Sequence, residues 1–267
     1  MMEPTYRLGA SIWGFYGRRR PEEWPTLPDA VCAVLGVDSS LGVEVWASKA
    51  LDAPPVADRE IDELVGACED AAFVSVHTRG AYWSWNPTAF RDEIDFAERV
   101  GARLLVLHPI TLGLVDSSDR IDVPEILRIA EYGGVRGVRL AVENVRDSVW
   151  MLDRVLEEVG DDPESTNLGI CVDVGHAHMS RDAGRDPVSN YLERYAGQLV
   201  HLHLHDNHGQ SDEHLVPGEG TIDWPRALRT VVEIGFSGTV VLEVHPTLGN
   251  SASEAIEQGL RRLRSER

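Results

Sequence analysis

Residues 201–220 read HLHLHDNHGQSDEHLVPGEG and hold five of the ten histidines in the chain. The opening His-Leu alternation predicts a β-strand with one polar face, because successive side chains of a strand point to opposite sides. The loop after this strand brings Asp212 and His214, two further groups that can bind a metal ion. We therefore expect a strand and its exit loop that together carry part of a metal site.

Apolar runs of similar length recur along the whole chain, and each is followed by a segment whose apolar residues have helical spacing. The predicted strands are 7–13, 42–48, 73–78, 103–109, 138–144, 168–176, 198–206 and 238–246. The predicted helices are 28–35, 58–70, 87–101, 123–132, 148–160, 186–197, 223–235 and 251–263. Strands that are almost entirely apolar indicate a parallel sheet buried on both faces, and eight strand-helix repeats match a (β/α)8 TIM barrel. No linker interrupts them, so we predict that residues 1–267 form a single α/β domain, with an open doubly wound sheet as the alternative.

The net charge of −19, with a single lysine at Lys49, disfavours nucleic acid and anionic membranes as partners, because a uniformly acidic surface repels phosphates. The chain lacks a long apolar segment and a signal-peptide pattern, so we expect a soluble protein. Its three widely spaced cysteines suit reduced thiols and a cytoplasmic location.

In a (β/α)8 barrel the functional residues lie at the carboxyl ends of the strands. A single histidine or acid at such an end is more often a structural residue than a ligand. A cluster of acids and imidazoles is different, since it is costly to bury unless a cation neutralises it. The candidate ligands at these ends are His77, His108, Glu143, Asp173, His176, His203, Asp212, His214 and Glu243.

The sequence around these positions resembles that of the xylose isomerase-like barrels, a family that unites sugar isomerases and epimerases with endonuclease IV. The resemblance covers nearly the whole chain, and the motifs that carry it are GVE (42–44), AVEN (141–144), CVDVGH (171–176), HLHDN (203–207), GEGTIDW (218–224) and LE (242–243). It implies one divalent ion, Mn²⁺, Mg²⁺, Co²⁺ or Zn²⁺, held by Glu143, Asp173, His203 and Glu243. Barrels of this family are often dimers or tetramers, so a homo-oligomer is compatible with the resemblance.

The epimerase-like members imply a sugar or sugar-derivative isomerase or epimerase with a small-molecule substrate. Glu143 and Glu243 would be the catalytic residues that transfer a proton through a metal-stabilised enediolate, and His176 would touch the substrate. We expect the substrate pocket to be lined by Trp13, Trp46, His77, His108 and His205, with packing of the loops over the barrel mouth as the alternative role of the two tryptophans.

Endonuclease IV implies an alternative, because it adds further ligands to the same four. The matching positions here are His77, His108, His176, Asp212 and His214. The resemblance therefore also permits up to three Zn²⁺ ions and hydrolysis of a phosphodiester, although the acidic charge weighs against DNA as the substrate. A keto-sugar lyase or dehydratase is a third alternative.

The run Arg18–Arg20 could receive a substrate phosphate or carboxylate, or be a solvated charge run, and the sequence leaves its role open.

Overall fold

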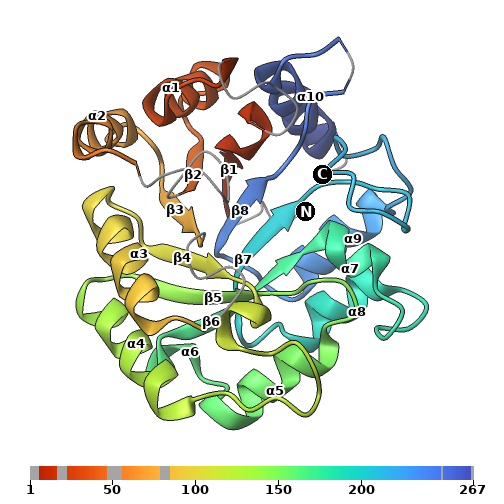
Figure 1. The fold of residues 1–267 in the computed structure, drawn as a ribbon. Helices are drawn as coiled ribbons and strands as arrows, with labels where there is room; N and C mark the ends of the chain where they lie inside the picture. Colours follow the sequence, from red (N-terminus) through yellow and green to blue (C-terminus); the bar gives the residue numbers. More distant parts are fainter. Residues whose placement is uncertain (1–5, 17–22, 47–55, 79–84, 248, 266–267) are drawn as a thin grey trace.

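The computed structural model describes residues 6–16, 23–46, 56–78, 85–247 and 249–265. Eight parallel strands follow one another in chain order, and β8 pairs with β1 to close a barrel. The strands are β1 Arg7–Ser11, β2 Gly42–Trp46, β3 Val74–His77, β4 Leu104–Leu107, β5 Arg139–Glu143, β6 Leu168–Asp173, β7 Leu199–Leu204 and β8 Thr239–Leu242. Figure 1 looks into this barrel, with the strands at the centre and the helices around them. The predicted (β/α)8 barrel is confirmed, and the open sheet is wrong.

The eight predicted helices also form. They are α1 Leu27–Val37, α2 Asp58–Cys68, α3 Pro87–Arg99, α4 Val123–Val135, α5 Val149–Val159, α8 Pro187–Arg194, α9 Trp224–Glu233 and α10 Ala252–Ser265. Thr26, Asn86, Asp122 and Asp223 begin four of these helices, because each side chain accepts a hydrogen bond from a backbone N–H of the first turn. None of the helices in these described ranges is long and apolar enough to cross a membrane.

Several predicted strands are too long, and three of them, 7–13, 103–109 and 168–176, run into a helix. The run 168–176 was expected to be extended throughout, but β6 ends at Asp173 and a short helix, α7 Val174–Met179, follows at once. The Asp173 carboxylate accepts a hydrogen bond from His176 N at 2.6 Å, which caps the helix and ends the strand. Helix α6 Pro163–Thr166 and the 3₁₀ helices η1 Ile12–Phe15 and η3 Pro109–Leu112 are further elements that the periodicity did not predict.

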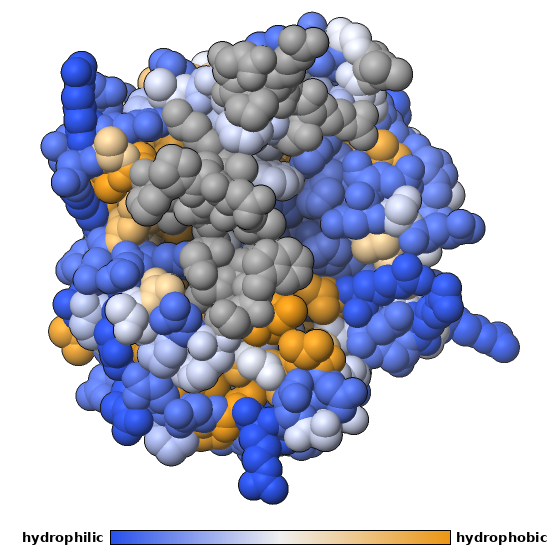
Figure 2. All heavy atoms as spheres, viewed as in Figure 1, coloured by the Kyte–Doolittle hydropathy of each residue, from blue (hydrophilic) through white to orange (hydrophobic). Residues whose placement is uncertain are grey.

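The two faces of the barrel wall have different chemistry. Leu105 and Leu107 of β4 belong to the large apolar core shared with the helices, whereas Leu104 and Val106 form a small separate cluster with residues of β5 and β6. Because strand residues alternate between faces, the small cluster lies inside the barrel. The rest of the described interior is notably polar and buried, and it includes Glu44, Ser75, His201 and His203. Hydrophilic residues also dominate the molecular surface on the face shown in Figure 2.

Candidate metal centre

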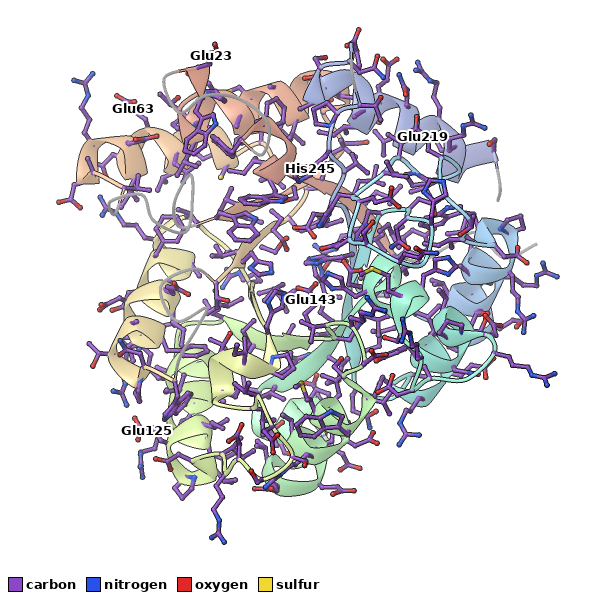
Figure 3. All side chains as sticks on the ribbon, turned by 45° about the vertical axis from the view of Figure 1, so that its right-hand side comes forward. Glu23, Glu63, Glu125, Glu143, Glu219 and His245 are labelled. Atoms are coloured by element: carbon purple, nitrogen blue, oxygen red, sulfur yellow. The ribbon has the colours of Figure 1, made fainter. Side chains whose placement is uncertain are left out.

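Four donor residues converge at the carboxyl end of the barrel. Glu143 ends β5, Asp173 ends β6, His203 lies in β7, and Glu243 directly follows β8. Their donor atoms all lie within 4.8 Å of one another, and all four residues are buried. Strand pairing explains part of this convergence, because Asp173 and His203 are register partners in neighbouring strands. Figure 3 shows Glu143 near the middle of the ring, whereas Glu63 and Glu125 lie at the outside of helices α2 and α4.

The hydrogen bonding of His203 shows that this set fits a cation. Its Nε2 lies 3.2 Å from Glu44 Oε2, and an ionised carboxylate only accepts, so Nε2 carries the proton. In the neutral ring Nδ1 then presents a lone pair. This atom has no hydrogen-bond partner among the described residues and lies 3.4 Å from Glu143 Oε1, 3.6 Å from Glu243 Oε2 and 3.9 Å from Asp173 Oδ2. A lone pair facing three carboxylates is repulsive unless a proton or a metal ion lies between them.

The electrostatics agree with an ionised donor set. Burial raises the pKa of the Glu143 carboxyl, but His203, His108 and His176 outweigh it and hold the pKa well below its ordinary value. Asp173 behaves in the same way. Burial raises its pKa, but His176 and His205 have the larger effect, so the pKa lies below its ordinary value. Both groups are therefore carboxylates at neutral pH, the form that binds a metal.

A second donor set adjoins the first through Glu143. His77 Nδ1 donates to the Thr78 carbonyl at 3.0 Å, which leaves its Nε2 facing Glu143 Oε2 at 3.1 Å. His108 Nε2 approaches the same oxygen at 3.3 Å. The donor atoms of His77, His108 and Glu143 lie within 4.8 Å of one another, so Glu143 could be shared by two ions.

A third donor set surrounds Asp212 in the loop after β7. His176 Nδ1 donates to the Asn144 carbonyl at 2.9 Å and His214 Nδ1 donates to the Glu243 carbonyl at 2.8 Å. The Nε2 atoms of these two rings then face Asp212 Oδ2 at 3.2 and 3.1 Å. A backbone carbonyl thus fixes the tautomer of each histidine, and each free nitrogen points at a carboxylate, as in metal sites.

His205 joins this third set, although the sequence predicted it only as a substrate contact. Its Nε2 lies 3.1 Å from Asp173 Oδ1 and 3.5 Å from Asp212 Oδ1, and it makes no hydrogen bond within the described part of the chain. The ring packs against Gly175, where a Cβ atom would lie only 2.0 Å from His205 Cε1. Only glycine fits there, which explains the glycine of the CVDVGH motif.

The loop that carries Asp212 and His214 is held by the buried Asp206. This carboxylate accepts hydrogen bonds from Asn207 N, Gly218 N, Ile222 N and Trp224 Nε1. The backbone of Asp206 also pairs with Leu215 in both directions. The HLHDN and GEGTIDW motifs therefore form one scaffold. His214 itself adopts φ +50°, an uncommon conformation for a residue other than glycine.

An aromatic wall borders the donor sets. The Trp13 and Trp46 rings stack at 4.5 Å, and Trp46 stacks on His77 at 4.3 Å with nearly parallel planes. The His245 ring lies 5.9 Å from the Trp13 ring and 5.0 Å from the His214 ring. The substrate-binding role of this wall stays a prediction, and Arg18–Arg20 lie outside the described residues.

The nine predicted ligands are thus brought together in three adjoining sets, joined by His205, which is a tenth donor. The sequence offered one signal for His205, because positions 201, 203 and 205 share one face of a strand. Glu44 belongs to the GVE motif, but the sequence predicted no role for it, because its two histidine partners are more than 150 residues away along the chain.

Comparisons with known proteins place the chain in a family. Residues 32–266 match the family described as xylose isomerase-like TIM barrel. The uncharacterised protein MJ1311 of Methanocaldococcus jannaschii is 32% identical over 161 residues, 57% of this chain and 54% of that protein. The chain thus spans about half the length of this relative.

Two solved structures share the fold over almost the whole chain. The structure of an L-ribulose 3-epimerase has a TM-score of 0.73 at 15% identity, and the match covers 98% of this chain and 95% of that one. The TTHB071 protein of Thermus thermophilus, soaked with ZnCl₂, has a TM-score of 0.63 at 25% identity, with 98% and 97% covered. From the family match over residues 32–266, we conclude that the chain belongs to the xylose isomerase-like TIM barrel family.

Proposed function

We propose that this protein is a divalent-metal-dependent isomerase or epimerase of a sugar or sugar derivative. The proposal rests on one observation, the positions of Glu143 and Glu243. Both belong to the same four-residue donor set, although they come from different sides of the barrel. Their strands, β5 and β8, have β6 and β7 between them in the ring, yet the donor atoms of the set lie within 4.8 Å of one another. Two carboxylates so placed can act on two faces of one substrate carbon.

The metal would be held by Glu143, Asp173, His203 and Glu243. A bound divalent cation would stabilise the negative charge that develops on a sugar carbonyl when the adjacent carbon loses its proton. One glutamate removes that proton and the other returns one, so the carbon is epimerised when the two act from opposite faces. His176 lies beside both Glu143 and Asp212, where its side chain can orient the substrate. The indole of Trp13, which is partly exposed and stacks on the buried Trp46, provides an apolar surface for a sugar ring.

The comparisons support the substrate class. The fold is shared with an L-ribulose 3-epimerase over nearly the whole chain.

Three carboxylates with one imidazole suit Mn²⁺, Mg²⁺ or Co²⁺, while the histidines of the outer sets favour Zn²⁺. The zinc-soaked TTHB071 protein is the relative that makes zinc a metal to test first.

The proposal is tested by proton exchange. Glu143→Gln and Glu243→Gln are each expected to reduce the exchange of sugar carbon-bound protons with D₂O by about 10²- to 10⁴-fold, the usual contribution of an acid-base residue. Glu213→Gln is the matched control, because Glu213 lies in the same loop as Asp212 but pairs with His208 instead of joining a donor set. Exchange that persists unchanged in both glutamate variants, across a panel of ketoses and aldoses that the wild-type protein turns over, would rule out the two-glutamate mechanism.

A phosphoesterase is the second candidate function, and a specific observation favours it. The donor sets adjoin one another through Glu143 and Asp173, which permits up to three Zn²⁺ ions side by side, and clustered ions stabilise the attacking and leaving oxygens of a phosphoester. Metal analysis of the purified protein separates the candidates, since one equivalent supports the isomerase and three equivalents of zinc support the hydrolase. Nicking of abasic duplex DNA that His77→Ala abolishes would establish the hydrolase instead.

A further inference from the structure

A network of buried polar groups lies inside the barrel next to the donor set. Glu44 of β2 is fully buried, and its Oε2 lies 2.9 Å from Ser75 Oγ, 3.2 Å from His201 Nε2 and 3.2 Å from His203 Nε2. Strands β2 and β7 are separated in the ring by β1 and β8, so the contacts from Glu44 to the two histidines cross the barrel interior. A buried carboxylate without such donors would be strongly destabilising.

The network fixes the proton positions on both imidazoles. Because an ionised carboxylate accepts and cannot donate, Ser75 Oγ and both Nε2 atoms are the donors to Glu44. His201 Nδ1 then accepts from Thr239 Oγ1 at 2.6 Å, so the second nitrogen of His201 is also paired. His203 differs, since its Nδ1 makes no hydrogen bond in the ranges that the structure describes and faces Glu143, Asp173 and Glu243.

We infer that Glu44 is a positioning residue that holds His203 with its proton on Nε2 and its Nδ1 lone pair directed into the donor set, while Ser75 and His201 hold the Glu44 carboxylate in place. The inference rests on the metal site of the proposed function. A carboxylate that accepts from the far nitrogen of a ligand histidine fixes the ring and increases its basicity, and loss of such a partner weakens metal binding by about 10- to 100-fold.

A purely structural role for Glu44 makes a different prediction. If the network only fills the interior, any damage to it should lower stability, and metal affinity should fall equally whichever member is removed. If Glu44 orients His203, metal affinity should depend on the contact between these two residues. Ser75 allows the two roles to be separated, because its hydroxyl donates to Glu44 and, among the described residues, makes no hydrogen bond to a member of the donor set.

The first experiment measures Co²⁺ and Zn²⁺ affinity by competition with a chelator in the full chain. Glu44→Met is expected to weaken binding by about 10- to 100-fold and to change the visible spectrum of the Co²⁺ form, whereas Ser75→Ala changes affinity only a few-fold. Equal affinity in Glu44→Met and wild type would overturn the inference, and so would an equal loss in Ser75→Ala. A wild-type protein that binds neither metal would instead refute the proposed function itself.

The second experiment keeps the inference testable if Glu44→Met does not fold. In the zinc-loaded protein with ¹⁵N-labelled histidine, His203 should show a bound proton on Nε2 and none on Nδ1. Glu44→Gln retains the size of the side chain but offers a weaker, uncharged acceptor, so the Nε2 proton resonance is expected to move upfield. A resonance that stays in place, or a His203 that carries its proton on Nδ1 in the wild type, would contradict the inference.

Discussion

At the scale of single residues, His214 combines an uncommon backbone conformation with two polar contacts in the candidate site. It adopts a positive φ, its Nδ1 donates to the Glu243 carbonyl, and its Nε2 faces Asp212. Burial lowers the pKa of the His214 imidazole, but the hydrogen bond to Asp212 and the charge of Glu243 outweigh burial and raise it from 6.5 to about 9. In the metal-free protein His214 and Asp212 are therefore an ion pair at neutral pH.

We predict that Asp212→Asn lowers the pKa of His214 in the metal-free protein from about 9 toward 6.5, as measured by an NMR titration of the histidine ring protons. The raised pKa means that protonation favours the fold. This stabilisation is complete below the unfolded value near 6.5 and is lost as the pH rises through about 9. Because a metal at this position must displace the proton, zinc affinity should increase with pH over the same window. A wild-type His214 that titrates near 6.5 would contradict the ion pair.

At the scale of elements, the short helix α7 matters because it brings Gly175 against the His205 ring. Gly175→Ala would place a Cβ atom 2.0 Å from His205 Cε1, so the ring has to shift from its present position beside Asp173 and Asp212. We expect a loss of about 1–3 kcal/mol in the free energy of unfolding, the usual cost of overpacking, together with weaker zinc binding.

Gly66→Ala in helix α2 is the matched control for that variant. A Cβ atom at Gly66 meets no described atom within 4 Å, so alanine should leave metal binding unchanged and stabilise the helix by roughly 0.5–1 kcal/mol. Urea unfolding and zinc titration of both variants provide the check. Wild-type zinc affinity in Gly175→Ala would show that His205 is not a donor.

The elements also show which features sequence reasoning can and cannot reach. The strands were predictable because each is an almost continuous apolar run, and the ligands at their ends followed from the barrel geometry. The end of β6 was missed because a side-chain cap at Asp173 overrides the apolar pattern. The role of Glu44 depends on which residues meet across the closed barrel, and no local pattern encodes that contact.

At the scale of the whole molecule, the fold gathers negative charge at its centre. Glu44, Glu143, Asp173 and Glu243 are all buried in one interior, in a chain whose net charge is already −19. Imidazoles offset part of this charge. Burial lowers the pKa of His203, but Cys171, Glu44, Glu143 and Glu243 raise it well above its ordinary value, so a proton on this ring is the expected counter-charge in the absence of a metal. A divalent ion neutralises the same carboxylates more completely.

Metal removal should therefore destabilise the whole barrel as well as its rim. A ligand at 100 times its dissociation constant stabilises the folded state by about 2.7 kcal/mol per site, which for a chain of 267 residues corresponds to a rise of about 5 °C in the melting temperature. We predict such a rise for one zinc ion, and a larger one if the other donor sets, which share Glu143 and Asp173 with the first set, bind further ions. The measurement compares chelator-treated protein with the same protein after zinc is added back, and Asp173→Asn serves as the control that abolishes most of the effect. A melting temperature that is the same with and without zinc would show that the buried acids are neutralised by protons alone.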